Sequence, residues 1–308
     1  MKVLLTGGSG QLASQLIISK PKSTKIIKSS RSELDVTCKD SCFEFVSKNK
    51  PDWIINCAAY TNVDKAETDF DLAYATNALA PKYLSEACGD YGGDLIHISS
   101  DYVFSGENEK PYLPKDKKSP INKYGLTKSI GEDFVLKNLG KSNRGIILRT
   151  SWLMGAFGNN FALKMLSLFN LKNELNIVSD QFSSPTSTTS LAKACWKIIE
   201  KKSNNEKLSP ILHFCDEGLA SWYDVAIFVS EIGKKLNIIE SNEYKINPIK
   251  TYQYPTPAKR PKFSQLDCKS TYSELLIKPP HWQESLEEEL KKYCLNLDLD
   301  NITRSKKC

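Results

Sequence analysis

The chain has 308 residues, of which 40% are hydrophobic and 25% are charged, and its formal net charge is +6. This excludes a disulfide-stapled miniprotein and a disordered segment, because a chain this long and this apolar can bury a large core. The basic residues are spread along the chain, whereas proteins that read nucleic acids usually gather them on one face or helix. We therefore expect a globular enzyme with no nucleic-acid partner. The mild positive charge is compatible with an anionic small substrate.

The nine cysteines are scattered, form no C-x-x-C pair and lie at no zinc-finger spacing from a histidine. An odd, scattered set is typical of a reducing compartment. The sequence shows no apolar run long enough to cross a bilayer and opens on no signal-peptide pattern. We expect a cytoplasmic protein with no membrane partner.

Apolar runs alternate with helical spacings through the first half of the chain. Expected strands cover residues 2–6, 25–28, 53–59, 94–99 and 144–151, and expected helices cover residues 12–19, 41–48, 71–91 and 122–139. Strands without polar alternation, separated by helices, predict a parallel sheet covered on both faces. The predicted fold class is therefore α/β, a doubly wound parallel sheet of the Rossmann type.

The second half is less regular. Expected helices cover residues 161–171, 191–202, 222–236 and 282–293, a strand lies within 208–215, a proline-rich loop covers 248–261, and the tail from 295 to 308 is expected to be loosely held. We predict a dinucleotide-binding domain over residues 1–150 and a smaller α/β substrate domain mainly over residues 151–308. Segments of about 186–216 are expected to pack back onto the first domain, and a cleft is expected between the two.

A glycine-rich loop, T-G-G-S-G-Q-L-A, follows the first expected strand and opens a helix. Gly7 and Gly10 allow a tight turn and close approach to a phosphate, and the helix N-terminus offers free N–H groups. Ala13 stands where the third glycine of the dinucleotide-binding pattern is often found, and alanine is allowed there. The pattern predicts a dinucleotide site; the alternative is a glycine turn that serves packing alone.

The second expected strand ends in K-S-S-R-S rather than in an acidic residue. An Asp or Glu at this point binds the ribose 2′-hydroxyl of NAD, whereas Arg31 and its neighbouring hydroxyls suit a 2′-phosphate. This favours NADPH, with NADH still possible; the alternative is a solvated basic turn. Asp35 lies close by and is expected either to reach the adenosine or to cap the next helix.

Tyr124 and Lys128 are four residues apart, so on a helix they share one face. A nearby ammonium lowers the pKa of a phenol, which makes tyrosine usable for proton transfer. Ser100 ends a strand at the edge where α/β sheets bind ligands, and its hydroxyl is expected to polarise a carbonyl beside Tyr124. The alternative is a surface Tyr–Lys pair on an amphipathic helix.

The ordered motifs carry a resemblance to known proteins. They are T-G-G-S-G-Q-L-A, N-C-A-A-Y-T-N-V-D-K-A-E, S-S-D-Y-V-F-S-G, Y-G-L-T-K, R-T-S-W-L-M-G-A-F-G-N-N-F, D-Q-F-S-S-P-T and Y-P-T-P-A-K-R-P. The set resembles the extended short-chain dehydrogenase/reductases and, within them, the dTDP-4-dehydrorhamnose reductase family, from residue 1 to about residue 290. The resemblance implies NADPH-dependent reduction of the C4 keto group of dTDP-4-dehydro-6-deoxy-L-mannose, giving dTDP-L-rhamnose for polysaccharides such as O-antigen.

The same resemblance implies roles for individual residues. Catalytic roles fall on Ser100, Tyr124 and Lys128, the serine replacing the family's threonine. Cofactor contacts fall on Gly7, Gly10, Gln11, Leu12, Asp35, Val36, Ala58, Ala59, Tyr60 and Thr61. Sugar-nucleotide contacts fall on Val63, Ser100, Asp101, Tyr102, Tyr124 and Trp152.

Two further residues are weighed against plainer interpretations. Trp152 is expected to stack on the sugar or base, unless it is an ordinary core aromatic at a strand end. Arg260 is a candidate for binding the diphosphate, and a solvated basic loop is the alternative.

One departure from the family concerns metal. Some members dimerise through magnesium held by glutamates, and the corresponding positions here are Gln15 and Thr189. Neither side chain is a strong magnesium ligand, so we expect no metal and either a monomer or a metal-independent homodimer.

Two other functions remain open. One is an epimerase, or a reductase of another nucleotide sugar, on the same scaffold. The other is a non-enzymatic, NADP-binding regulatory subunit of a methionine adenosyltransferase-like partner, since such relatives can keep the tyrosine and lysine.

Overall fold

The computed structural model describes residues 1–240 and 244–305, and side-chain surroundings as far as residue 296. In this part of the chain, a six-stranded sheet has the order β10-β5-β4-β3-β1-β2, and every pairing in it is parallel. Its strands are β1 (Lys2–Thr6), β2 (Lys25–Lys28), β3 (Trp53–Asn56), β4 (Asp94–Ser100), β5 (Gly145–Thr150) and β10 (Ile211–His213). The strand order reverses between β1 and β3, which is where such sheets bind ligands at their carboxyl ends.

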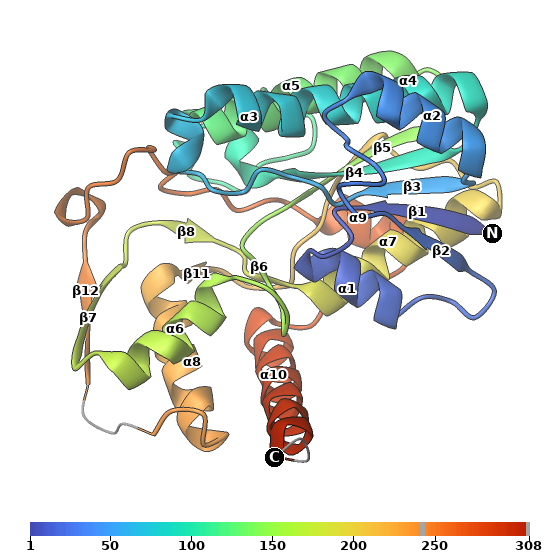
Figure 1. Ribbon diagram of the computed structural model, residues 1–308. Helices are drawn as coiled ribbons and strands as arrows, with labels where there is room; N and C mark the ends of the chain where they lie inside the picture. Colours follow the sequence, from blue (N-terminus) through green and yellow to red (C-terminus); the bar gives the residue numbers. More distant parts are fainter. Residues whose placement is uncertain (241–243, 306–308) are drawn as a thin grey trace.

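Helices cover both faces of the sheet (Figure 1). One face carries α2 (Lys39–Asn49), α3 (Phe70–Tyr74), α4 (Ala80–Tyr91) and α5 (Lys123–Leu139), and the other carries α1 (Gln11–Ile18), α7 (Thr188–Ser203) and α9 (Lys269–Leu275). Residues that alternate along β1 enter separate cores, with Leu4 on the α2–α5 side and Leu5 on the α1–α7 side. This double burial explains the uninterrupted apolar strands, and the predicted doubly wound parallel sheet is confirmed.

A second group of elements lies to one side of the sheet (Figure 1) and has its own core. Its helices are α6 (Phe161–Leu171), α8 (Trp222–Lys235) and α10 (Trp282–Ser305). Its strands form three pairs: β7 (Glu174–Val178) and β12 (Lys245–Ile249), β8 (Phe182–Ser183) and β11 (Ala220–Ser221), and β6 (Leu153–Met154) and β9 (Thr186–Ser187). Met165, Phe169, Val229 and Trp282 are among the buried residues of this core.

The two groups of elements are interleaved along the chain. Helix α7 and strand β10 come after β6, β7 and α6, yet β10 pairs with β5 and α7 packs on α1. The Trp196 indole on α7 donates a hydrogen bond to the Ser19 hydroxyl just after α1, at 3.2 Å. The first sheet is therefore completed by residues from the later half of the chain.

Three predicted elements differ from the structure. The helix expected over 71–91 is divided by a π-helical turn (Ala75–Leu79), after which Pro81 lies in the first turn of α4, where its missing N–H costs little. The loop expected over 248–261 begins inside β12, because Pro248 pairs with Ile177 in a two-stranded sheet whose edge tolerates proline. The last helix was expected to end at residue 293, but α10 continues to Ser305; residues 306–308 of the expected tail lie outside the described residues.

Candidate active site

Two adjoining cavities lie at the carboxyl ends of the sheet strands. The first, of about 720 Å³, is lined by Gly7, Gly10, Arg31, Asp35, Val36, Ala58, Ala59 and Tyr60 among the predicted cofactor residues. The second, of about 610 Å³, is lined by Gly10, Gln11, Leu12, Ala59, Thr61, Ser100, Tyr124, Lys128 and Trp152 among the predicted residues. Ser9, Gly10, Cys57 and Ala59 line both, so the two cavities form one continuous candidate site.

The glycine loop is shaped by close backbone approach. Gly7 has φ +62°, and a Cβ there would lie 2.9 Å from the backbone of Ala58, so a side chain would collide with the segment after β3. The Gly10 N–H donates to the Gly7 carbonyl at 2.8 Å, and Gly10 is the N-cap of α1. The free N–H groups and the positive end of the dipole of α1 therefore face the site, as an anionic phosphate requires.

The end of β2 supplies charged groups to the first cavity. Arg31 is exposed and lines the cavity beside Ser30 and Glu33. The Glu33 carboxylate accepts hydrogen bonds from the Ser30 amide and hydroxyl, each at 2.8 Å. Asp35 accepts bonds from the Thr37 hydroxyl at 2.6 Å and the Thr37 amide at 3.0 Å, and these hold the pKa of Asp35 below its ordinary value. Asp35 thus orders the turn into α2 while it lines the cavity.

Tyr124 is fixed in the first turn of α5. The Asn122 side chain caps this helix by accepting the Gly125 N–H at 2.8 Å. A Cβ at Gly125 would collide with the Tyr102 carbonyl oxygen, so α5 approaches the segment after β4 more closely than another residue would permit. The rings of Tyr102 and Tyr124 then meet edge to face, with centroids 5.7 Å apart.

Ser100 joins this cluster from the end of β4. Its hydroxyl donates to the Asp101 carboxylate at 2.9 Å and accepts the Tyr102 N–H at 3.2 Å. Burial raises the pKa of Tyr124 to about 12, against the opposing effect of its hydrogen bond with Ser100. Tyr124 therefore keeps its proton at neutral pH, which is the form that a proton donor needs.

Lys128 is buried one turn after Tyr124. Its ammonium donates to the Ile98 carbonyl at 2.6 Å, and burial lowers its pKa to about 8. The expectation that Lys128 lowers the pKa of Tyr124 is wrong for this arrangement, because the ammonium turns to the backbone of β4 and burial dominates at the phenol. The four-residue spacing places both groups on one face, as predicted, but does not determine which way the lysine points.

Trp152 lies on the wall of the second cavity and stacks on Trp222 at 3.6 Å between ring centroids. Its φ of +44° is unusual for a bulky residue. The Trp222 indole donates to Gln181 at 3.1 Å, and Phe161 packs on the same ring at 4.7 Å. Trp152 is therefore one face of an aromatic stack at the cavity wall, and sequence reasoning did not identify Trp222.

The remaining predicted substrate residues line neither cavity. Asp101 and Tyr102 are buried behind Ser100, and Val63 is partly buried in the loop before the turn Lys65–Glu67. Arg260 forms two contacts with the Asp64 carboxylate, at 2.7 Å and 3.0 Å, on the wall of a third cavity of about 350 Å³. The alternative of a solvated basic loop is wrong for Arg260, because the guanidinium is paired and partly buried.

Other residues of the site escaped sequence reasoning. Asn77, in the π-helical turn, is buried, and its side chain forms two hydrogen bonds with the backbone of Tyr60. It accepts one from the Tyr60 N–H at 2.9 Å and donates one to the Tyr60 carbonyl at 3.0 Å. Gln11 was expected only to contact cofactor, but its amide also donates to the Leu153 carbonyl at 3.3 Å across the second cavity. The Thr150 hydroxyl is buried without a partner among the described residues, beside that cavity. A π-turn and a single asparagine leave no periodic signal in a sequence.

The positions related to metal binding hold a different network. The Glu289 carboxylate is buried and accepts the Thr189 hydroxyl at 2.6 Å, and the Lys292 ammonium donates to the same hydroxyl at 2.6 Å. Gln15 is buried on α1. Within the described residues, no group of three or more His, Cys, Asp or Glu is placed to hold a metal ion. In the same part of the chain, no helix is both long and apolar enough to cross a membrane.

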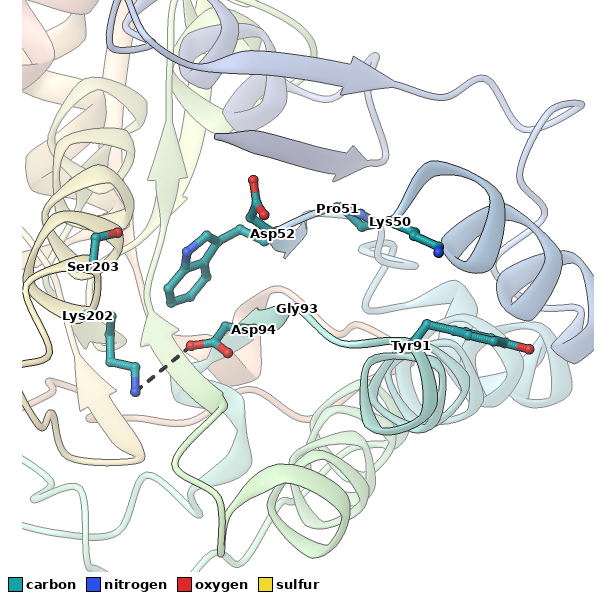
Figure 2. A pocket seen from close by; sticks show the side chains of 9 residues that line it. Lys50, Pro51, Asp52, Tyr91, Gly93, Asp94, Lys202 and Ser203 are labelled. Atoms are coloured by element: carbon teal, nitrogen blue, oxygen red, sulfur yellow. Dashed lines mark ion pairs between the residues drawn. The ribbon is translucent and has the colours of Figure 1, made fainter.

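Another hollow, of about 400 Å³, lies at the opposite edge of the sheet (Figure 2). It is lined by Asp52 and Asp94 at the amino ends of β3 and β4, together with Lys50, Tyr91 and Lys202. Its two carboxylates already have partners, since Lys202 lies 3.9 Å from Asp94 and the Lys2 amide donates to Asp52. It contains none of the predicted site residues and lies at the sheet edge where such folds do not bind cofactors.

A doubly wound parallel sheet, a glycine loop at the point of strand reversal, and a Tyr–Lys pair one helical turn apart define an oxidoreductase of the short-chain dehydrogenase/reductase class. The family model described as "RmlD substrate binding domain" matches residues 1–295. The dTDP-4-dehydrorhamnose reductase of Aggregatibacter actinomycetemcomitans is 38% identical over 92% of this chain and 97% of its own length. The chain belongs to the dTDP-4-dehydrorhamnose reductase family.

Solved structures agree with this assignment. The dTDP-4-dehydrorhamnose reductase from Clostridium acetobutylicum is 38% identical, with a TM-score of 0.86 over 94% of this chain and 99% of that one. The dTDP-4-dehydrorhamnose reductase from Bacillus anthracis, solved in complex with NADP, is 32% identical, with a TM-score of 0.84 over the same shares. The two relatives span both groups of elements, so the likeness extends beyond the dinucleotide half.

Proposed function

We propose that the protein reduces the C4 keto group of dTDP-4-dehydrorhamnose with NADPH, giving dTDP-L-rhamnose for polysaccharide biosynthesis. The observation that carries this proposal is the second cavity, which Ser100, Tyr124 and Lys128 line together with residues of the glycine loop. The names of the relatives supply the sugar nucleotide, and the bound NADP of one of them supplies the cofactor.

The first cavity fits a dinucleotide. Gly7 lets the loop turn tightly against the backbone of Ala58, and the start of α1 presents N–H groups that suit a phosphate. Arg31 and the Ser30 hydroxyl suit a 2′-phosphate, and Asp35 in the same cavity is assigned by this proposal to the adenosine ribose. When bound, NADPH supplies the hydride that reduces the keto carbon.

The residues of the second cavity handle the carbonyl oxygen. Tyr124 retains its proton at neutral pH and donates it to this oxygen, while the Ser100 hydroxyl hydrogen-bonds the same oxygen as negative charge develops there. Lys128, whose pKa is about 8, keeps a positive charge nearby, and the proposal assigns it to the nicotinamide ribose. The Trp152–Trp222 stack offers a flat apolar surface to the sugar or the base.

The test is a coupled assay of NADPH oxidation with dTDP-4-dehydrorhamnose and other dTDP-4-keto-6-deoxy sugars. Tyr124→Phe is expected to lower kcat by about 100-fold or more while leaving NADP binding intact, because only proton donation is lost. The matched control is Tyr91→Phe, a tyrosine exposed on α4 at the opposite edge of the sheet. Tight NADP binding without turnover of any keto sugar would instead support the regulatory-subunit function.

Cofactor choice has a separate test. Arg31→Met is expected to raise KM for NADPH by about tenfold and to leave KM for NADH unchanged, because only NADPH carries the 2′-phosphate. The matched control is Glu33→Gln in the same turn, which removes a negative charge instead of a positive one. This variant is not expected to raise KM for NADPH. An equal change of KM for both cofactors would contradict the role of Arg31.

A further inference from the structure

The buried surroundings of Lys128 contain a carboxylate with no part in the chemistry described so far. Glu132 follows Lys128 by one helical turn on α5, and its side chain is fully buried. We propose that Glu132 is a positioning residue that keeps Lys128 charged and directed at β4 while both are buried. This inference rests on the proposed function of the site.

The Glu132 carboxylate is held at both oxygens. Oε1 accepts the Ser99 hydroxyl at 2.6 Å and the Arg149 Nε at 2.8 Å, and Oε2 accepts the Arg149 Nη2 at 2.7 Å. Although burial alone would raise the pKa of Glu132, these bonds and the charges of Arg149 and Lys118 hold it below its ordinary value. The carboxylate therefore carries a fixed negative charge inside the protein.

Lys128 and Glu132 form hydrogen bonds with consecutive residues of the same strand. Lys128 donates to the Ile98 carbonyl, Glu132 accepts from the Ser99 hydroxyl, and the catalytic Ser100 comes next on β4. The carboxylate thus fixes the spacing between α5 and the end of β4. Any change in that spacing moves Lys128 and Ser100 relative to each other.

Glu132 also compensates for the burial of Lys128. Among the charges around the ammonium, Glu132 is the largest one that raises its pKa. Cys57 after β3 also lies nearby, but burial raises the pKa of its thiol to about 12, so it stays neutral where Lys128 titrates. His97 on β4 is buried near Lys128. Burial, together with the positive charge of Lys128, holds the pKa of His97 well below its ordinary value, so His97 stays neutral. Around Glu132 itself stand Arg149 from β5 and Lys118 from the segment before α5.

The direct test follows the Cε resonance of Lys128 by NMR in protein labelled with carbon-13 lysine, assigned with Lys128→Met. In the wild type this lysine is expected to titrate with a pKa of about 8. In Glu132→Gln the titration is expected to move down by about one unit or more, because the nearest negative charge is gone. The matched control is Asp133→Asn, the same chemical change at an exposed position next on the helix. This readout needs no turnover, so it stands apart from the test of the proposed function.

The second readout is the pH profile of kcat/KM with NADPH and the keto sugar. Its high-pH limb is expected to move to lower pH in Glu132→Gln and to stay in place in Asp133→Asn. An unmoved limb and an unmoved lysine titration would overturn the proposal and leave Glu132 a purely structural residue. If Glu132→Gln does not fold, Glu132→Gln with Arg149→Met removes both buried charges together. The lysine titration is then expected to move down by less than in the single variant, because the lost charge of Arg149 acts in the opposite direction.

Discussion

Asp101 is a carboxylic acid with 2% of its surface exposed, beside three serine hydroxyls. Burial raises its pKa to about 6, although bonds from Ser264, Ser100 and Ser183 favour the charged form. Because the folded protein binds this proton more tightly than the unfolded chain, the resulting stabilisation is present below the ordinary value of 3.8 and is lost as the pH rises through about 6.

The free energy of unfolding of the wild type is therefore expected to fall by about 1–3 kcal/mol as the pH rises across this window, and that of Asp101→Asn is expected to lack this fall. Urea unfolding at a series of pH values measures it. Asp90→Asn, at an exposed position near the end of α4, is the control and should follow the wild-type curve. The same pH dependence in Asp101→Asn and wild type would contradict the assignment.

At the residue scale, sequence reasoning selected residues that line the two adjoining cavities, but it did not give the directions of their side chains. The Y-x-x-x-K spacing placed Tyr124 and Lys128 on one face, and the strand-end position placed Ser100 nearby. The turn of Lys128 towards Ile98 and the pairing of Arg260 with Asp64 depend on partners far away in the chain. No local pattern contains that information.

At the scale of elements, α5 packs closely against the segment after β4 at Gly125. Gly125→Ala would drive a methyl group into the Tyr102 carbonyl oxygen, so α5 must shift and carry Tyr124 with it. We expect a loss of stability of about 1–3 kcal/mol and a large fall in kcat. Thermal unfolding and the NADPH assay measure the two effects.

The control for that substitution is another helical glycine. Gly89 lies in α4, and apart from its chain neighbours and the nearby backbone of its own helix, no atom of the described residues comes within 4 Å of the place that an added methyl group would take. Gly89→Ala is therefore expected to stabilise the protein by up to about 1 kcal/mol through helix propensity. Opposite signs for the two substitutions are the expected result. If Gly125→Ala were as stable and active as wild type, close packing of α5 would not be what positions Tyr124.

The long helices and the sheet strands were predictable because apolar periodicity extends over many residues. The strands β6, β8, β9 and β11 have two residues each, which is too short for any period to appear. The π-turn was missed for a different reason, since the sequence over 71–91 reads as continuous helix and the bond between Asn77 and Tyr60 joins residues 17 positions apart.

At the scale of the whole molecule, the Asp64–Arg260 ion pair joins residues 196 positions apart, from the two groups of elements. The pair is partly exposed, so Asp64→Asn is expected to lower stability by only about 0–1 kcal/mol. If Arg260 binds the diphosphate, freeing it from Asp64 should lower KM for the sugar nucleotide, whereas Arg260→Met should raise it.

Steady-state kinetics with the sugar nucleotide varied at saturating NADPH separate the two variants. A rise in KM for the sugar nucleotide in both variants would show that the ion pair maintains the structure of the site and that Arg260 does not bind the diphosphate. Lys262→Met is a useful control, because Lys262 lines the same third cavity and its charge is not part of the pair.

The interleaved chain path has a consequence for how the protein is made. Leu191 and Trp196 of α7 and Leu275 of α9 close the core beneath β1, and β10 covers the open edge of β5. During synthesis on the ribosome, more than one hundred residues after residue 150 must therefore be made before α9 can cover that face of the sheet. A polypeptide released after residue 150 would expose this apolar surface and a bare strand edge, and would be a natural client for chaperones.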